Sequence, residues 1–368
     1  MKAVTWQGRR HVAVTDEPDP RVEEPTDAIV RITSTAICGS DLPIYELFGP
    51  FLDRGDILGH ESMGIVEAVG RDVVTLRPGD RVVVPFNIAC GRCFMCRRGL
   101  QSQCETTQND QYGTGASLFG YTKLYGQVPG GQAELLRVPL ADENTIPVGT
   151  DLPDERYLFL SDILPTAWQA VEYTGLSEPS TLVVLGLGPV GQLAARIGVQ
   201  RGHRVIGIDP VPERRAMAVR HGVEGDDDVA RVIAHTQGRG ADAVIDAVGL
   251  EAHGSPFAHA AHAVTAALPD ALARPVMENT GVDRLAALHA SVDMVRRGGT
   301  ISISGVYVGD SDVMPMKTMF DKQLTLRMGQ CNVKRWIDDL RPYAEADDDP
   351  LGLDDLVTHR AGLAEAPD

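Results

Sequence analysis

The chain has 368 residues, more than a single hydrophobic core usually organises, so two domains are expected. Its net charge of −17 argues against a surface for nucleic acid or for anionic membranes, because both need clustered lysine and arginine. No apolar run reaches the roughly 20 residues of a membrane span. The first residues, MKAVTWQGRR, lack the apolar core of a signal peptide, and we therefore expect a cytoplasmic protein.

The first part of the chain, to about residue 150, is rich in short strand patterns. Apolar and polar residues alternate over 2–6, 11–15 and 28–36, and turns that contain proline or glycine separate such segments. This pattern predicts a β-rich domain that folds as a partly open barrel.

After residue 151 the pattern changes to strands that alternate with helices. The predicted strands are residues 181–186, 204–209, 241–249, 298–306 and 323–329. Strands and helices in this order predict right-handed βαβ units on a parallel, doubly wound sheet, so the fold class is α/β. Residues 250–290 are alanine-rich and longer than one connecting helix needs, and we interpret them as a helical insertion.

A glycine fingerprint marks the first of these strand–helix units. It consists of Gly186-Leu187-Gly188-Pro189-Val190-Gly191 and fits the dinucleotide pattern G-x-G-x-x-G. Gly186 allows the tight turn, Gly188 lets the backbone approach a pyrophosphate, and Gly191 lets helix and strand pack closely. Asp209 ends the next strand, where it would accept a ribose 2′-hydroxyl and repel a 2′-phosphate, so NAD is favoured over NADP. Arg214 and Arg215 lie slightly further along and would weaken that preference.

Four of the six cysteines lie within fifteen residues, and they are Cys90, Cys93, Cys96 and Cys104. In a long chain without a secretion signal, such clustering favours metal over disulfides. Four thiolates suit a closed, tetrahedral structural zinc site. An iron–sulfur cluster is the competing interpretation, but the ferredoxin pattern has a proline after its last cysteine, and here Glu105 follows.

The second metal candidate combines Cys38, His60 and Asp162. A catalytic zinc takes three protein ligands and keeps a fourth position open. The three residues lie far apart in the chain, so spacing alone does not distinguish a metal site from a buried cysteine and a hydrogen-bonded turn histidine. Asp162 precedes an apolar, helix-like run that leads to the glycine fingerprint. We expect metal and nucleotide to meet across a cleft that holds the substrate.

Several motifs together resemble the zinc-dependent medium-chain alcohol dehydrogenase family. They are ICGSD at 37–41, GHE at 59–61, G-x-V-x-x-V-G at 64–70, PGDRV at 78–82, the four-cysteine loop and GLGPVG at 186–191. The segments PFNIACGRC at 85–93, SDILPT at 161–166 and AVGLEAHG at 247–254 further resemble the branch with glutathione-independent formaldehyde dehydrogenase. The resemblance implies a GroES-like catalytic domain over 1–160 and 331–368, and a Rossmann NAD-binding domain over 161–330. It also implies two zinc ions per chain and a homo-oligomer, a dimer or a tetramer.

The resemblance implies roles for the metal candidates. Cys38 and His60 match ligands of the catalytic zinc, and Asp162 matches the aspartate that this branch uses where other members have a cysteine. Glu61 is expected beside the zinc as a supporting group or a transient ligand.

Residues near the substrate are implied in the same way. Ser40 matches the hydroxyl that takes the substrate proton, and Phe86 matches an aromatic wall of the pocket. Trp168 is a further candidate wall, although an aromatic residue on a helix also suits a core. Many relatives have a histidine shortly after CGSD as the end of a proton relay, whereas this chain has Leu42-Pro43-Ile44. Relatives also continue beyond HRAGLAEAPD with a helix and a strand, so we expect a truncated or different end of the catalytic domain.

These observations predict a zinc-dependent oxidoreductase that transfers a hydride between NAD and a small alcohol or aldehyde hydrate. The motifs do not define the substrate, so a polyol or amino-alcohol dehydrogenase on the same scaffold stays open. A non-enzymatic alternative is a zinc-stabilised nucleotide-binding protein that senses redox state. Metal content separates this binding protein from the enzymes, because an enzyme of this kind needs two zinc ions per chain and the binding protein needs one.

Overall fold

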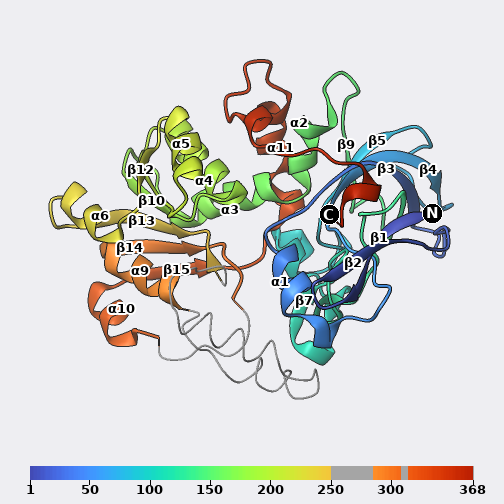
Figure 1. Ribbon diagram of the computed structural model, residues 1–368, viewed down its shortest axis with the longest axis horizontal. Coiled ribbons are helices and arrows are strands. Elements are labelled where there is room, and N and C mark those ends of the chain that lie inside the picture. Colours follow the sequence, from blue (N-terminus) through green and yellow to red (C-terminus); the bar gives the residue numbers. More distant parts are fainter. Residues whose placement is uncertain (250–284, 308–313, 368) are drawn as a thin grey trace. The chain divides into compact units, whose positions relative to one another are not determined.

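The computed structural model describes residues 1–249, 285–307 and 314–367 (Figure 1). It divides into two compact units, which we call unit 1 (Met1–Pro165 with Cys331–Asp368) and unit 2 (Thr166–Gln330). The sequence-based boundary stood at residue 160, so the structure assigns five further residues, 161–165, to unit 1. Most of the predicted insertion, residues 250–284, lies outside the described residues. The predicted fold class, a β-rich domain together with a parallel α/β sheet, is confirmed.

A five-stranded antiparallel sheet in the order β8-β3-β4-β5-β9 forms the core of unit 1. Its strands are β3 (Ala28–Ala36), β4 (Glu61–Val69), β5 (Arg81–Val84), β8 (Leu135–Val138) and β9 (Ile146–Pro147). Alternation along the strands puts Val30, Val66 and Val82 on one buried face. The β3–β4 register shifts at Ile29/Val30 and again at Ile32/Ser34, and such bulges bend a sheet toward a barrel.

The other elements of unit 1 surround this sheet. Two short antiparallel pairs join β1 (Lys2–Gly8) to β2 (His11–Asp16) and β6 (Gln108–Asn109) to β7 (Thr114–Ala116). The helices are α1 (Asp41–Glu46), α2 (Asp154–Leu158), α11 (Val333–Glu345) and the start of α3 (Ile163–Thr174). Helix α11 buries one face, with Trp336, Ile337 and Leu340 at helical spacing.

A six-stranded parallel sheet forms unit 2. Its strands are β10 (Thr181–Leu185), β11 (Arg204–Ile208), β12 (Glu224–Asp226), β13 (Ala241–Asp246), β14 (Val295–Ile303) and β15 (Thr325–Met328). The described helices between them are α4 (Pro189–Gln200), α5 (Pro212–Arg220), α6 (Val229–His235), α9 (Ala286–Met294) and α10 (Met316–Lys322). Helices α4 and α5 cover one face of the sheet and α9 and α10 the other (Figure 1).

The strand order of unit 2 fixes where a ligand can bind. The order is β12-β11-β10-β13-β14-β15, so the chain runs outward from β10 to β12 and then returns to the other side of β10. The direction reverses between β10 and β13, and open α/β sheets bind ligands at this point, outside the carboxyl ends of the strands. Sequence analysis missed β12 because its three residues, EGD, have no apolar alternation.

An ion pair between buried Arg81 and half-buried Asp154 fastens α2 to the sheet of unit 1. The Arg81 guanidinium pairs with Asp154 and donates to the carbonyl oxygens of Gly149 and Leu152 at 2.6 and 2.8 Å. Ser34 Oγ donates to the same carboxylate at 2.7 Å. Burial raises the pKa of Asp154, but hydrogen bonds from Thr33, Arg81 and Ser34 outweigh burial and lower it.

Replacing Asp154 by asparagine is expected to lower the free energy of unfolding at pH 7 by about 2 kcal/mol, because Arg81 stays buried without its charged partner. The pKa of Asp154 is lower in the folded protein than in the unfolded chain. Its ionised carboxylate therefore stabilises the fold at pH values above the unfolded-state pKa, and this stabilisation is lost as the pH falls through the folded-state pKa. Urea unfolding from pH 7 to 3 should therefore show a shallower loss of stability in Asp154→Asn than in the wild type. Asp16→Asn, which breaks an exposed pair with Lys2, is the control and should change nothing measurable. Parallel pH curves for Asp154→Asn and the wild type would contradict this account.

Candidate functional site

The second metal candidate is a real cluster within unit 1. Cys38, His60, Glu61 and Asp162 each offer a ligand atom, and these atoms all lie within 4.8 Å of one another. His60 Nε2 is 3.3 Å and Cys38 Sγ is 4.0 Å from Asp162 Oδ2. The three residues that spacing could not connect, Cys38, His60 and Asp162, are thus brought together by the fold.

Strand pairing explains this convergence. Strands β3 and β4 run antiparallel and pair Ala36 with Glu61, so the chain that leaves β3 carries Cys38 past the start of β4. Asp162 lies between a 3-10 helix and α3, and the preceding residue, Ser161, accepts a hydrogen bond from Phe86 N at 3.1 Å. That bond ties the segment before α3 to the end of β5, and it thereby fixes the position of Asp162.

The charges of the cluster favour a bound cation. Burial, followed by the charge of Glu61, raises the pKa of the Cys38 thiol to about 12. Burial and the charge of Asp162 raise the pKa of Glu61 to about 8. One Glu61 oxygen, Oε2, is buried and has no hydrogen-bond partner among the described residues. Three acidic groups crowded around one imidazole fit a divalent metal ion, which would supply the missing positive charge and partner.

Asp41 supports the cluster, and sequence analysis missed it. Its Oδ1 lies 3.1 Å from His60 Nδ1, and its Oδ2 accepts a hydrogen bond from Cys38 N at 2.9 Å. Burial lowers the pKa of His60, but the charge of Asp41 and hydrogen bonds to Asp162 and Asp41 hold it well above its usual range. Asp41 therefore orients two of the candidate ligands, as outer carboxylates do in metal sites. Its position in ICGSD was the available signal.

Aromatic rings and a hydroxyl adjoin His60. Ser40 Oγ lies 3.3 Å from His60 Nε2. The rings of Phe86 and Tyr121 meet the imidazole edge-on, with centroids at 6.3 and 6.5 Å. Sequence analysis named Ser40 and Phe86 but missed Tyr121, which lies in a loop after β7 and belongs to no recognisable motif. Trp168 lies in unit 2, where it is buried with the Arg201 guanidinium 4.2 Å from its ring centre; its role as a pocket wall stays a prediction.

The four-cysteine loop forms the second cluster of unit 1. The sulfur atoms of Cys90, Cys93, Cys96 and Cys104 lie within 4.8 Å of one another. Backbone amides point at two of them, since Cys90 N donates to Cys104 Sγ at 3.3 Å and Cys96 N to Cys93 Sγ at 3.4 Å. Burial raises the pKa of Cys90, but hydrogen bonds from Thr106 and nearby amides lower it to about 6. Burial, by contrast, raises the pKa of the Cys96 thiol. Four converging sulfur atoms suit a tetrahedral zinc site.

The glycine fingerprint of unit 2 has the geometry that a pyrophosphate needs. Gly186 has a φ of +88°, Gly188 caps α4, and Pro189 and Val190 begin that helix. A Cβ on Gly191 would collide with the Gly186 carbonyl oxygen, whereas one on Gly188 would meet nothing within 4 Å. The open space beside Gly188, at the amino end of α4, is therefore suited to an anion.

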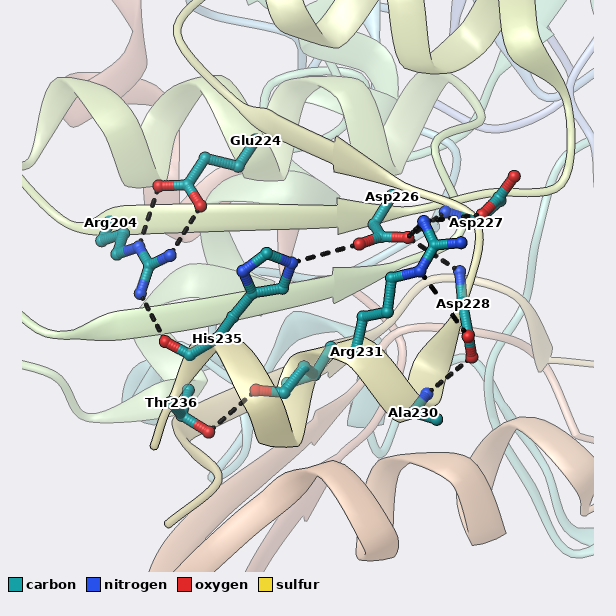
Figure 2. Close-up of polar contacts among 10 residues, drawn as sticks. Arg204, Glu224, Asp226, Asp227, Asp228, Ala230, Arg231, His235 and Thr236 are labelled. Carbon is teal, nitrogen blue, oxygen red and sulfur yellow. Dashed lines mark hydrogen bonds and ion pairs between the residues drawn. The ribbon is translucent and has the colours of Figure 1, made fainter. Parts of the chain in front are cut away.

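Carboxylates dominate the neighbouring edge of the sheet. Asp209 is buried, and its two oxygens accept hydrogen bonds from Leu187 N and Val211 N, both at 2.8 Å. Figure 2 shows Asp226, at the end of β12, with Asp227 and Asp228 around Arg231. The arginines near Asp209 are also paired, with Arg214 3.6 Å from Asp209 and Arg215 3.6 Å from Asp227.

Comparisons with known proteins identify the family to which the chain belongs. Residues 24–149 match the alcohol dehydrogenase GroES-like domain. The whole chain is 38% identical over 377 residues to the uncharacterized zinc-type alcohol dehydrogenase-like protein AdhB of Bacillus subtilis, of which it covers 94%. The chain belongs to the zinc-type alcohol dehydrogenase family. The predicted resemblance is therefore confirmed.

Further similarities lie within the zinc-type alcohol dehydrogenase family and its fold. The formaldehyde dismutase of Pseudomonas putida is 32% identical over 366 residues, which are 92% of this chain and 82% of that protein. The glutathione-independent formaldehyde dehydrogenase of Pseudomonas aeruginosa is 34% identical over 331 residues, which are 83% of this chain and 75% of that protein. The structure of alcohol dehydrogenase TADH from Thermus sp. ATN1 is 34% identical, has a TM-score of 0.81, and covers 100% of this chain and 94% of its own.

Family membership makes the chain an oxidoreductase, and zinc and usually a nicotinamide nucleotide belong to zinc-type alcohol dehydrogenases. Within the described ranges, no helix combines the length and the apolar character needed to cross a membrane.

Proposed function

We propose that this protein is a zinc- and NAD-dependent dehydrogenase that moves a hydride between NAD and a small alcohol or aldehyde hydrate. The observation that carries the proposal is the convergence of Cys38, His60, Glu61 and Asp162 within 4.8 Å in a member of this family. The charges of that cluster fit a metal, and the fingerprint of unit 2 fits a dinucleotide. The cytoplasmic location and the homo-oligomer, a dimer or a tetramer, remain predictions.

Cys38, His60 and Asp162 would hold the catalytic zinc, and Glu61 would be a supporting group or a transient ligand. When bound, zinc supplies a Lewis acid that lowers the pKa of a substrate hydroxyl. Cysteinate and aspartate each bring one negative charge and neutral histidine none, so the two charges of Zn²⁺ are balanced. Cys90, Cys93, Cys96 and Cys104 would hold the second, structural zinc.

The remaining residues of the site would handle the proton and the carbon skeleton. Ser40 Oγ, 3.3 Å from His60 Nε2, is the hydroxyl available to accept the substrate proton through a hydrogen bond. Asp41 keeps the His60 ring oriented while this happens. The rings of Phe86 and Tyr121 offer apolar surface beside the cluster, which suits a short carbon chain better than a highly hydroxylated one.

The nucleotide edge supports NAD over NADP. The open space at Gly188 suits the pyrophosphate, and each Asp209 oxygen retains a lone pair for a ribose hydroxyl after accepting one amide. A 2′-phosphate would meet this buried carboxylate. Arg214 and Arg215 are the cations nearest in the chain, and both already face carboxylates. The predicted weakening of the NAD preference by Arg214 is therefore expected to be small.

The substrate class rests on two observations. The third candidate ligand is an aspartate, as the resemblance to the formaldehyde-oxidising branch implies. Two relatives that match more than four-fifths of this chain act on formaldehyde by their names. We therefore favour an aldehyde hydrate or short primary alcohol over a polyol.

An NADH-absorbance assay with metal analysis tests this function. We expect two zinc ions per chain and turnover with NAD on formaldehyde or a short or aromatic primary alcohol. The kcat/KM with NADP should be lower by about tenfold or more, the cost of an unpaired buried charge in one binding site. Turnover of polyols or amino alcohols alone would contradict the proposed substrate class, an aldehyde hydrate or short primary alcohol, and would leave the enzymatic proposal standing. A protein that binds one zinc and NAD but turns over none of these compounds would contradict the enzymatic proposal.

A further inference from the structure

A buried carboxylate ends the strand beside the switch point of unit 2. Asp246 is the last residue of β13 and has no exposed surface. Its side chain accepts hydrogen bonds from Val248 N at 3.0 Å, from Gly249 N at 3.2 Å and from the Tyr307 hydroxyl. All three partners donate, as an ionised carboxylate requires. Burial raises the pKa of Asp246 above its usual value, and these hydrogen bonds offset only part of that rise.

The same residue joins two loops that are far apart in the chain. Its backbone carbonyl accepts from Ser304 N and Gly305 N, both at 2.9 Å, just after β14. Its side chain meanwhile holds the loop after β13, residues 247–249, and reaches Tyr307 in the loop after β14. Asp246 is therefore a clamp between the carboxyl ends of two neighbouring strands.

The clamped loops touch through their backbones. Gly249 has a φ of +58°, and a Cβ there would lie 2.5 Å from Val306 N. A Cβ on Gly305 would collide with Gly249 in turn. Val306, beside this close contact, is an apolar residue that is 48% exposed. A rigid edge that presents one apolar side chain is suited to pack against a flat ring.

The topology indicates which ring that is, provided that the proposed NAD dependence holds. The fingerprint puts the pyrophosphate at the amino end of α4, and Asp209 on the β11 side suits the adenosine ribose. A dinucleotide that crosses the switch point extends its other half over the ends of β13 and β14. We propose that Asp246 and Tyr307 are positioning residues for the nicotinamide half of the cofactor, through the two loops that they join.

Replacing Tyr307 by phenylalanine removes the hydroxyl and keeps the ring. Binding of NADH and of ADP-ribose, which lacks only the nicotinamide, should be measured on the full chain by fluorescence titration and calorimetry. We expect the affinity for NADH to fall about tenfold, as expected for losing one hydrogen bond to a charged group, and the affinity for ADP-ribose to change less than about twofold. The fluorescence enhancement of bound NADH should fall as well, because the nicotinamide ring is held less firmly.

Thr236→Val is the matched control. Thr236 is also buried in unit 2, and its hydroxyl donates to Val232 O at 2.8 Å and accepts from Gly240 N at 2.9 Å, at the amino end of β13 (Figure 2). This variant should lose stability, but its affinities for NADH and for ADP-ribose should change by the same factor. If Tyr307→Phe does not fold, Asp246→Asn, which keeps the size of the side chain, should show the same selective loss.

Three results would overturn the inference. If the wild type binds both NADH and ADP-ribose, and Tyr307→Phe binds NADH as tightly as the wild type does, this inference is refuted while the proposed NAD dependence stands. An equal loss of NADH and ADP-ribose affinity would reduce the clamp to a general structural role. A wild type that binds neither ligand would remove the proposed NAD dependence and this inference with it.

Discussion

Replacing Cys38 by serine is expected to lower kcat/KM for the alcohol or aldehyde substrate by about 10³-fold. Serine stays protonated at neutral pH and binds zinc far more weakly than a thiolate. Loss of the metal removes a Lewis acid worth several kcal/mol, and about 4 kcal/mol corresponds to about 10³ in rate. Zinc content should fall from two ions to one per chain, and the remaining ion should belong to the four-cysteine loop.

Cys331→Ser is the matched control for Cys38. Cys331 is buried in the same unit and belongs to neither cluster, so the substitution makes the same chemical change away from the metal candidates. It should retain both zinc ions and its activity, although burying a hydroxyl costs some stability. Undiminished turnover in Cys38→Ser with one zinc lost would remove Cys38 from the catalytic site.

Replacing Cys104 by alanine is expected to remove the second zinc and to lower the free energy of unfolding by about 3 kcal/mol or more. Cys104 has no exposed surface, and its sulfur also accepts the Cys90 amide. The three remaining thiolates would repel one another without the ion, and zinc binding to structural sites contributes directly to folding. Thermal unfolding together with metal analysis measures both effects.

Cys331→Ala separates the metal from the loss of volume in this second experiment. It removes the same atom from a buried position outside both clusters and should cost about 1 kcal/mol. A melting temperature for Cys104→Ala equal to that of Cys331→Ala would show that the four-cysteine loop holds no stabilising ion.

Local patterns explain what could be predicted from the sequence. The fingerprint at 186–191 and the loop at 90–104 each lie on one short segment, so their spacing alone determines which groups converge. Asp209 follows from the same local logic, since it ends the strand next to the fingerprint. Long-range contacts behave differently. Asp162 meets Cys38 across 124 residues, and only the resemblance to a known family connected the two.

The residues that sequence analysis missed depend on tertiary packing. Tyr121 reaches His60 from a loop without regular pattern, and Asp246 reaches Tyr307 across 61 residues. Strand β12 is too short to show periodicity, and its pairing with β11 defines it. The end of the predicted insertion forms α9, which begins at Ala286, while residues 250–284 lie outside the described ranges.

Unit 1 is discontinuous in the chain, and this affects how it is completed during synthesis. All the candidate metal ligands precede residue 163, yet the unit also needs Cys331, Asn332 and α11. Asn332 Oδ1 accepts from Ser102 N at 3.0 Å and from Ser102 Oγ at 2.9 Å, close to the four-cysteine loop. On a ribosome, unit 2 is synthesised in full before these residues emerge, so its parallel sheet can form first. The contacts of Asn332 with Ser102, close to the four-cysteine loop, can therefore form only after the whole of unit 2 has been synthesised.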